Sequence, residues 1–252
     1  MFIYFGGGRM IEVTELSKVF KKITAVDNIS FKVESGEILG LIGENGAGKT
    51  TTLRMLATML RASSGTAKIE GYDINKEAYK VRGKIGILFG GEVGLYDRLT
   101  ARENIRYFAE LNGMSKEEIS TSIDYLVKIL EMEEYVDRRV GKFSRGMKQK
   151  VAIARSIVHN PTVMLFDEPT AGLDVTAARI VQDFIIKCKE KNNSIIFSSH
   201  SMQEVERICD RLVIIHKGKI LEEGTVDYLK DKYQSSDMEE IFMKLVGDKI
   251  EK

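Results

Sequence analysis

Residues 37–60 read EILGLIGENGAGKTTTLRMLATML, and this stretch decides the fold expected for the rest of the chain. Its apolar start predicts a buried strand over residues 37–42, and its end predicts a helix over residues 50–60. Between them, residues 43–50 fit the pattern GxxxxGK[ST]. A strand, a glycine-rich loop and a helix in that order are the context in which this pattern binds phosphate groups. The sequence therefore predicts a phosphate-binding loop at the carboxyl end of the strand.

Each part of this loop has a chemical role. Glycine lets the backbone N–H groups curl around phosphate oxygens, and the positive end of the helix dipole points at them. Lys49 is expected to contact the β and γ phosphates of a nucleotide, and Thr50 to give its hydroxyl to Mg²⁺. The loop residues expected to bind the nucleotide are Gly43, Glu44, Asn45, Gly46, Ala47, Gly48, Lys49, Thr50 and Thr51. The alternative is a glycine-rich turn without a ligand.

The segment VMLFDE at residues 163–168 is an apolar strand that ends in two adjacent carboxylates. Two acids that leave a buried strand side by side repel each other unless a cation is present. A metal ion accounts for the pair: Asp167 is expected to hold Mg²⁺, and Glu168 to orient and deprotonate an attacking water. Without the phosphate-binding loop, an ordinary acidic strand end would be the better interpretation.

The composition fits a globular chain with a sizeable core. Of 252 residues, 43% are hydrophobic, and 38 basic against 37 acidic residues leave a net charge of +1. Such a balance gives no field that would recruit nucleic acid, so no nucleic-acid partner is expected. Cys188 and Cys209 stand in no metal-binding or disulfide spacing, which favours a reducing compartment. The apolar runs are shorter than the ~18 residues that a membrane-spanning helix needs.

Strands and helices alternate on both sides of a helical segment. Strands are predicted at residues 11–16, 29–33, 67–70, 85–89, 163–166, 194–198 and 212–216, and between Gly218 and Gly224. Residues 101–137 repeat apolar side chains at helical spacing, which predicts a helical lobe. Further helices are predicted at residues 146–159, 175–190, 202–210 and 238–252. This alternation argues for a parallel sheet covered by helices, an α/β fold.

The chain is expected to divide into one domain and two extensions. Residues 10–225 would form the domain, with a helical subdomain inserted at about residues 91–142, and residues 226–252 would form a C-terminal helical extension. Residues 1–9 are interpreted as a non-native or disordered extension, because the Gly-Gly-Gly-Arg before Met10 is what a purine-rich ribosome-binding site would encode. We therefore expect synthesis to start at Met10, which mass spectrometry of the native protein can check.

The segment FSRGMKQ at residues 143–149 resembles the signature of ABC transporter ATPases, usually written LSGGQ. Ser144 and Gly146 keep the two positions with which that family grips the γ-phosphate of ATP bound on the opposite subunit. Arg145 and Met147 depart from the pattern and look like the variant found in ABC-2 exporters. Taken alone, the segment would only be a serine cap ahead of an amphipathic helix.

Three further residues match the family in its order along the chain. Asp174 ends the segment AGLD at residues 171–174, which resembles the D-loop that crosses the dimer interface. His200 follows an apolar strand and resembles the switch histidine that contacts the γ-phosphate. Phe20 precedes the phosphate-binding loop and resembles the aromatic residue that stacks on adenine. A single Phe or His would otherwise be interpreted as a core or surface residue.

The resemblance implies a RecA-like parallel-sheet core that carries the P-loop, an N-terminal antiparallel β subdomain and an inserted α-helical subdomain. It implies that Lys49, Glu168 and His200 are the catalytic residues of an ATPase that uses ATP and Mg²⁺. Two copies would close head to tail around two ATP molecules and power a separate transmembrane permease subunit from the cytoplasmic face of the membrane. The other two histidines, His159 and His216, are assigned structural roles.

Within the family, FGGE at residues 89–92 and LYDRLTAREN at residues 95–104 look most like the ATPases of ABC-2 exporters, particularly those that extrude sodium. Non-transport ABC ATPases are an alternative, although their long coiled coils or tandem ATPase units are absent from this sequence. A P-loop kinase or GTPase would leave Ser144, Gly146 and His200 without a role.

One family residue has no counterpart. In the family, a glutamine whose side chain reaches Mg²⁺ follows the strand that precedes the helical lobe, whereas Gly90 and Gly91 stand here. Neither glycine has a side chain, and the carboxylate of Glu92 would repel the γ-phosphate. We therefore expect Glu92 to stay out of the site and Thr50 and Asp167 to be the only side-chain ligands of the metal.

Overall fold

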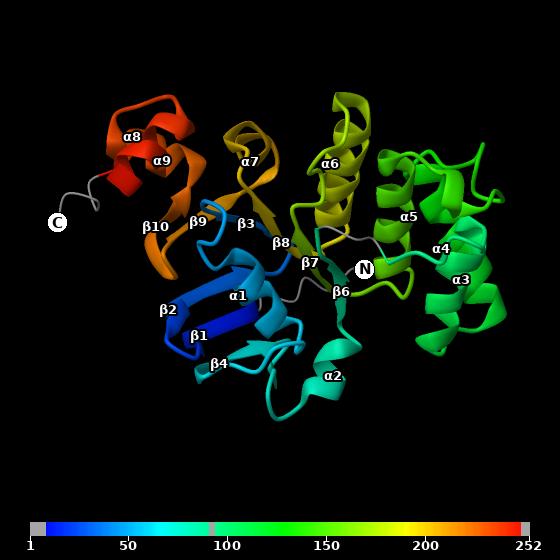
Figure 1. The fold of residues 1–252 in the computed structure, drawn as a ribbon, viewed down its shortest axis with the longest axis horizontal. Helices are drawn as coiled ribbons and strands as arrows, with labels where there is room; N and C mark the ends of the chain where they lie inside the picture. The colour runs from blue at the N-terminus through cyan, green and yellow to red at the C-terminus, as the bar shows by residue number, and fades with distance from the viewer. Residues whose placement is uncertain (1–8, 91–93, 248–252) are drawn as a thin grey trace, which may run out of the picture.

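The structure is a computed structural model that describes residues 9–90 and 94–247. Its N-terminal part is a four-stranded antiparallel sheet in the order β2-β1-β4-β5, at the lower left of Figure 1. The strands are β1 (Arg9–Phe20), β2 (Ile23–Glu34), β4 (Ser64–Ile69) and β5 (Tyr72–Asp73). The predicted antiparallel β subdomain is therefore confirmed.

β1 extends well beyond its predicted end at Leu16. Its pairing with β2 shifts register between Val13 and Leu16, where Glu15 takes a left-handed backbone with a φ of 49°. Such a β-bulge interrupts the two-residue alternation of side chains without ending the strand. Alternation in the sequence thus marks only the first half of the strand. At the other end, Arg9 is part of β1 rather than of the expected extension, whose residues 1–8 lie outside the described residues.

The larger sheet has six strands in the order β10-β9-β3-β8-β7-β6. They are β3 (Ile38–Ile42), β6 (Ile85–Leu88), β7 (Val163–Asp167), β8 (Ser194–Ser199), β9 (Arg211–His216) and β10 (Lys219–Thr225). Neighbouring strands are parallel, except that the edge strand β10 runs antiparallel to β9. This sheet is the predicted core, and it sets the carboxyl ends of β3, β8 and β7 side by side.

Helices lie on both sides of this sheet and beyond its β6 edge (Figure 1). They are α1 (Lys49–Leu56), α2 (Ala78–Arg82), α3 (Ala101–Leu111), α4 (Lys116–Ile129), α5 (Arg145–Ile157), α6 (Val175–Glu190), α7 (Met202–Ile208), α8 (Val226–Tyr233) and α9 (Met238–Gly247). A single 3₁₀ turn, Val140–Lys142, precedes the signature segment. Within the residues that the structure describes, no helix is both long enough and apolar enough to cross a bilayer.

The predicted helical lobe contains α3 and α4, and both begin at capping boxes. Thr100 and Glu103 exchange side-chain and backbone hydrogen bonds before α3, and Ser115 with Glu118 does the same before α4. Each box satisfies two N–H groups that a helix start leaves without a partner. The lobe lies against α5, at the right of Figure 1, and so adjoins the helix that follows the signature segment.

Several boundaries differ from the prediction. α1 ends at Leu56 rather than at residue 60, because Thr58 takes a left-handed backbone with a φ of 59° that an α-helix cannot contain. α7 ends at Ile208, and α9 ends at Gly247, beyond which the chain lies outside the described residues. α2 and β5 were not predicted, since elements this short show no periodicity.

Both faces of the larger sheet are covered, so central strands such as β3 and β7 are buried at every position and do not alternate with exposed polar residues. On β7, Met164 and Phe166 pack into a core shared with α5 and α6. Val163 and Leu165, on the other face, pack against α1 and the antiparallel sheet. Asp167 is two residues beyond Leu165 and therefore points to the side of α1.

Candidate active site

The predicted site residues converge where parallel strands end. The phosphate-binding loop follows β3, the acid pair stands at the end of β7, and His200 follows β8, which lies between the other two strands. Carboxyl ends of neighbouring parallel strands open on one edge of a sheet, and ligands of such sheets bind there. Segments more than a hundred residues apart in the sequence thus meet in one place.

The phosphate-binding loop presents the start of α1 without a side-chain cap. Gly48 occupies the N-cap position with a φ of 112° and offers no side chain to the first N–H groups of the helix. A Cβ there would lie 2.6 Å from the Ala25 carbonyl oxygen, so both the backbone and the space require glycine. A hollow of about 110 Å³ over the helix start is lined by Asn45, Gly46, Gly48, Lys49, Thr50, Thr51 and Glu168. Uncapped N–H groups at a helix start attract anions.

Lys49 connects this loop to the acid pair. Its side chain is only 5% exposed, and Nζ donates to the carbonyl oxygens of Gly43 at 2.6 Å and Glu44 at 3.1 Å. Burial lowers the pKa of this ammonium, and the negative charges of Glu168, Asp167 and Glu44 oppose that shift. The cation is therefore held beside the hollow by carbonyl groups that phosphate oxygens could replace.

Asp167 is held by a hydroxyl group on each side. Thr50 Oγ1 donates to its Oδ2 at 2.7 Å, and Ser198 Oγ donates to its Oδ1 at 2.5 Å. A carboxylate and a hydroxyl, completed by waters and substrate phosphates, form the kind of oxygen shell that Mg²⁺ takes in proteins. Over residues 9–90 and 94–247, no group of three or more His, Cys, Asp or Glu side chains could hold a metal by itself. The donor set fits a magnesium ion that is shared with a nucleotide.

Glu168 lies between two nitrogen groups. Its Oε1 is 3.9 Å from Lys49 Nζ and 3.4 Å from His200 Nδ1. Its backbone is left-handed, with a φ of 47°, which is uncommon for a residue with a side chain. Its N–H donates to both the carbonyl and the hydroxyl oxygen of Ser198, at 3.1 Å each. The carboxylate that lines the hollow is thus tied to β8 through its own backbone.

Four predicted residues lie elsewhere: among the described residues, Ser144, Gly146, Asp174 and Phe20 neither line the hollow nor form a hydrogen bond or ion pair with Lys49, Asp167, Glu168 or His200. Ser144 caps α5, where its Oγ accepts the N–H of Met147 at 3.2 Å, and Asp174 caps α6. Phe20 is 44% exposed at the end of β1. A single chain therefore brings together the phosphate loop, the acid pair and His200, and leaves the signature segment apart from them.

The position of the missing glutamine is described only in part. Gly90 adjoins the acid pair, since a Cβ there would lie 3.2 Å from the Asp167 carbonyl oxygen. Gly91 and Glu92 lie outside the described residues, and the expectation for Glu92 stays a prediction.

The two remaining histidines have packing roles of different kinds. Nε2 of His159 lies 3.2 Å from the Ile85 carbonyl oxygen, and burial lowers the pKa of this ring against that hydrogen bond. His216 is buried, and its Nδ1 lies 3.5 Å from Glu44 Oε2 in the phosphate loop. The structural assignment of His216 therefore includes a contact with the site that its place at a strand end did not reveal.

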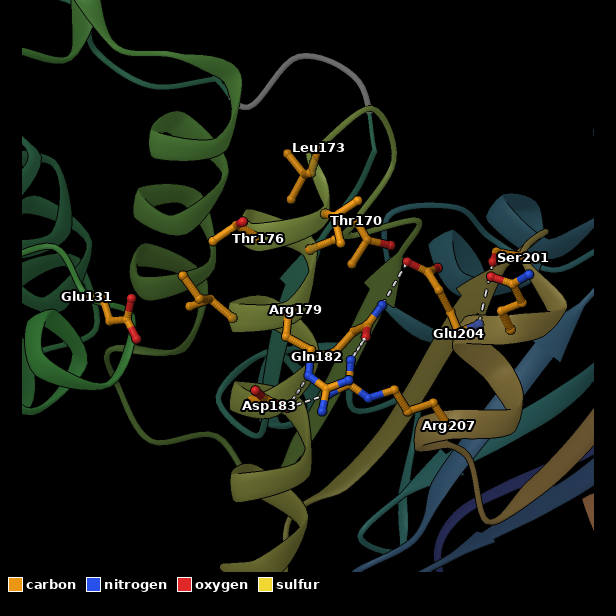
Figure 2. Close-up of a pocket in the computed structure, with 14 residues that line it drawn as sticks. Glu131, Thr170, Leu173, Thr176, Arg179, Gln182, Asp183, Ser201, Glu204 and Arg207 are labelled. Atoms are coloured by element: carbon orange, nitrogen blue, oxygen red, sulfur yellow. Dashed lines mark hydrogen bonds and ion pairs between the residues drawn. The ribbon is translucent and has the colours of Figure 1, made fainter.

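A second hollow, of about 780 Å³, runs along α6 and α7 (Figure 2). Its buried Gln182 donates to Glu204 Oε1 at 3.0 Å, and Arg207 donates to Gln182. Figure 2 shows these side chains reaching from one helix to the other. Glu204 Oε2 in turn accepts from Ser199 Oγ at 2.9 Å. The contacts tie the end of β8 to the helix α6.

Ser198 and Ser199 were not identified from the sequence, although a signal exists. They close the segment SIIFSS, a wholly buried strand with an apolar middle, directly before His200. A buried hydroxyl has to find a hydrogen-bond partner. Two of them in a row at the end of a core strand therefore indicate polar neighbours at that edge of the sheet.

Known proteins resemble the chain along most of its length. A family model described as ABC transporter matches residues 26–171. NatA of Bacillus subtilis, an ABC transporter ATP-binding protein, is 47% identical over 93% of this chain and 97% of its own length. The bacitracin transport ATP-binding protein BcrA of Bacillus licheniformis is 39% identical over 88% of this chain and 72% of its own length.

Solved structures share the fold. The ATP-binding subunit of an ABC transporter superposes with a TM-score of 0.86 at 29% identity, covering 94% of this chain and 99% of that one. A dimeric ATP-binding cassette in a post-hydrolysis state, bound to ADP and Pi, gives a TM-score of 0.78 at 25% identity, covering 86% of this chain and 98% of its own.

Proposed function

Because the chain belongs to the family of ABC transporter ATP-binding proteins, we propose how its residues divide the binding and hydrolysis of ATP. The chain is an ATPase subunit of an exporter-type transporter, and one of its relatives is named a Nod factor export ATP-binding protein. The observation that carries the assignment of roles is the position of Glu168, which lies between Lys49 and His200 at the end of β7. A base in that position faces the place where the γ-phosphate of a bound nucleotide would lie.

In the proposed reaction, Lys49 and the backbone N–H groups of the loop bind the β and γ phosphates of ATP. Thr50 and Asp167 would hold Mg²⁺, which when bound supplies positive charge to the phosphate oxygens. Glu168 orients a water and accepts its proton as the water oxygen bonds to the γ phosphorus. The bond from that phosphorus to the bridging oxygen breaks, giving ADP and inorganic phosphate. His200 contacts the γ-phosphate during this step.

The second copy of the chain completes each site. Ser144 and Gly146 stand outside the hollow of their own chain, so the side of the γ-phosphate that faces away from Lys49 is left for another molecule. A head-to-tail pair would bring the signature segment of one subunit, together with Asp174, to the phosphate loop of the other. Dimeric cassettes among the structural relatives support the pairing. Phe20, at an exposed strand end, would then stack on adenine.

The membrane partner is a separate permease subunit. Relatives of this chain are named as ATP-binding proteins of transporters. We place the subunit on the cytoplasmic face of the membrane, since ATP is available on that side, and attach it there through the permease. Opening and closing of the ATPase pair would then drive alternating access.

Mixing two inactive variants tests the head-to-tail pair. In a mixed dimer of Lys49→Ala and Ser144→Asp subunits, one site carries both changes and the other carries neither. The mixture should therefore release phosphate faster than either variant alone at equal total protein. A mixture of Lys49→Ala with Glu168→Gln is the control, because each of its sites keeps one change. Failure of the first mixture to exceed its components would overturn the arrangement.

A further inference from the structure

Ser198 lies where the strands of the site adjoin. Its strand, β8, runs between β3, which leads to the phosphate loop, and β7, which ends in the acid pair. The register sets Ser198 opposite Asp167. Side chains alternate along a strand, and Ile196 and Leu165 both pack on the α1 side of the sheet. Two residues further along each strand, the serine and the aspartate point to that side as well.

One hydroxyl group serves both acids. Ser198 is fully buried, and its Oγ donates to Asp167 Oδ1 at 2.5 Å while it accepts the N–H of Glu168 at 3.1 Å. A serine hydroxyl offers one donor and two acceptor positions, so both contacts can exist together. A hydroxyl in a buried apolar strand is unfavourable unless it is hydrogen-bonded. Here its partners are the two residues to which the proposed reaction assigns the metal and the proton.

The two contacts constrain different parts of the reaction. The other oxygen of Asp167 accepts from Thr50, so two hydroxyls fix the plane of this carboxylate. Glu168 has a left-handed backbone, which a residue with a side chain adopts only at a cost, and its N–H is shared between the hydroxyl and the carbonyl oxygen of Ser198. Loss of the Ser198 hydroxyl would leave Asp167 held by Thr50 alone and the Glu168 N–H held by the carbonyl alone, so both acids would be less firmly oriented.

We propose that Ser198 is a positioning residue of the ATPase site, which holds the magnesium ligand Asp167 and the base Glu168 in fixed relation through a single hydroxyl. It acts through these two acids and not on the nucleotide. This inference rests on the proposed function, because it assigns Ser198 to the geometry of that same reaction.

Ser194 offers a matched control on the same strand. It is also fully buried, and its Oγ donates to the Glu34 carbonyl oxygen at 2.9 Å, at the opposite end of β8. Ser194→Ala removes the same atom from the same strand without touching either acid. Both serine variants therefore lose some packing and one buried hydrogen bond, but only the Ser198 variant loses a contact with the two acids.

Ser198→Ala and Ser198→Cys test the proposal in the full chain. Alanine removes the hydroxyl, and cysteine keeps a side chain of similar size with only a weak donor. Both should lower kcat by about 10- to 100-fold, as small misplacements of reacting groups do. The Mg²⁺ concentration for half-maximal rate should rise, while ATP affinity without Mg²⁺ stays unchanged. The gain in ATP affinity on adding Mg²⁺, measured by equilibrium binding, should shrink.

Wild-type kcat and Mg²⁺ dependence in both Ser198 variants would overturn the proposal, as would an equal loss in Ser194→Ala. If Ser198→Ala does not fold, Ser198→Cys and the binding measurement decide the question. Failure of the proposed function itself looks different. In that case Glu168→Gln would hydrolyse ATP as fast as the wild type, whereas a failed Ser198 proposal leaves Glu168→Gln inactive.

Discussion

Two helices of this protein start after glycine-containing segments, and they start in opposite ways. The N-cap residue of α1 is Gly48, which has a left-handed backbone and no side chain to cap the helix. The N-cap residue of α5 is Ser144, whose hydroxyl accepts the N–H of Met147. The first start is open to an anion. The second is closed by its own serine, which satisfies one of the N–H groups that a phosphate would otherwise bind.

For the proposed function, this difference implies that the two segments meet the nucleotide at different stages. The loop at α1 already has its hollow and its buried Lys49, so we expect one chain to bind ATP there. Ser144 accepts through its oxygen and keeps a hydroxyl hydrogen to donate, so it can contact a phosphate of a second chain while it still caps α5. Variants near α1 should change ATP binding by a single subunit, whereas variants at the start of α5 should leave that binding unchanged and alter only those steps of ATP hydrolysis that need two subunits.

The largest effect is expected at Glu168, to which the proposed reaction assigns a role in hydrolysis and not in binding. Glu168→Gln keeps the size of the side chain but removes the base, so turnover should fall by about 10³-fold while ATP still binds. Phosphate release and equilibrium binding of a fluorescent ATP analogue measure the two separately. Dimers should accumulate in saturating ATP and be visible by size-exclusion chromatography. Glu117→Gln, the same exchange on the exposed surface of α4, is the control. Equal losses of binding and turnover would contradict the role of Glu168 as base.

Lys49→Ala should act on binding as well as turnover. The variant loses a charged donor to the phosphates and keeps the backbone of the loop, so the affinity of a single subunit for ATP should fall about 10- to 100-fold. Hydrolysis should fall by about 10²-fold or more. ATP titrations at protein concentrations too low for dimers measure the first effect, with the exposed Lys68→Ala as control. Near-normal ATPase activity in Lys49→Ala would contradict the assignment of the phosphate loop.

Two variants of Ser144 can distinguish its role as the N-cap of α5 from its proposed contact with a phosphate group. Ser144→Ala loses both, so stability should fall by about 1 kcal/mol and ATPase activity by about 10-fold. Ser144→Asp keeps the cap but cannot donate, so it should retain stability and lose at least as much activity. Ser115→Ala, which removes the equivalent cap of α4, should lose stability alone. Urea denaturation and phosphate release measure these effects. A fall in ATP binding by single subunits of either Ser144 variant would break the comparison.

The smallest effect is expected just beyond the far end of α5. Burial lowers the pKa of His159, so the unfolded chain binds a proton that the folded chain disfavours. Stability should be constant near neutral pH and fall as the pH drops below about 6.5, the unfolded value, toward the lower folded one. His159→Gln should flatten that fall in urea denaturation series, without changing ATP binding at neutral pH. If both proteins lose stability equally, His159 is not the group that titrates.

The open helix start could be predicted because GENGAGKT carries its geometry in its own glycines. The acid pair could be predicted for a similar reason, since two carboxylates at the end of an apolar strand are informative by themselves. The hydroxyl between the acids could not be predicted in this way. The register that sets Asp167 opposite Ser198 depends on tertiary packing, because α6 separates the two strands in the sequence. The left-handed backbone of Glu168 has no sequence signal either.

In the fold, long elements were predictable, and α6 has its predicted bounds, but several other ends were not predictable. Periodicity identified the helices of the lobe, and alternation of strands with helices identified the parallel sheet. The bulge at Glu15 hid the second half of β1, and the left-handed Thr58 ended α1 early. Both are single-residue backbone events that a pattern averaged over many residues cannot resolve. At the signature segment, Ser144 caps α5, as a serine ahead of an amphipathic helix is expected to do, and its contact with a nucleotide on the opposite subunit stays a prediction.

The larger sheet ends in strands that resist further pairing. β6, at one edge, is only 4 residues long. β10, at the other, carries the charged residues Lys219, Glu222 and Glu223. Short or charged edge strands discourage a sheet from taking up strands of another molecule. In the proposed pair, a subunit would meet its second copy through loops at the strand ends, and these edges would keep it from joining that copy edge to edge, the geometry through which crowded β-proteins turn into insoluble fibres.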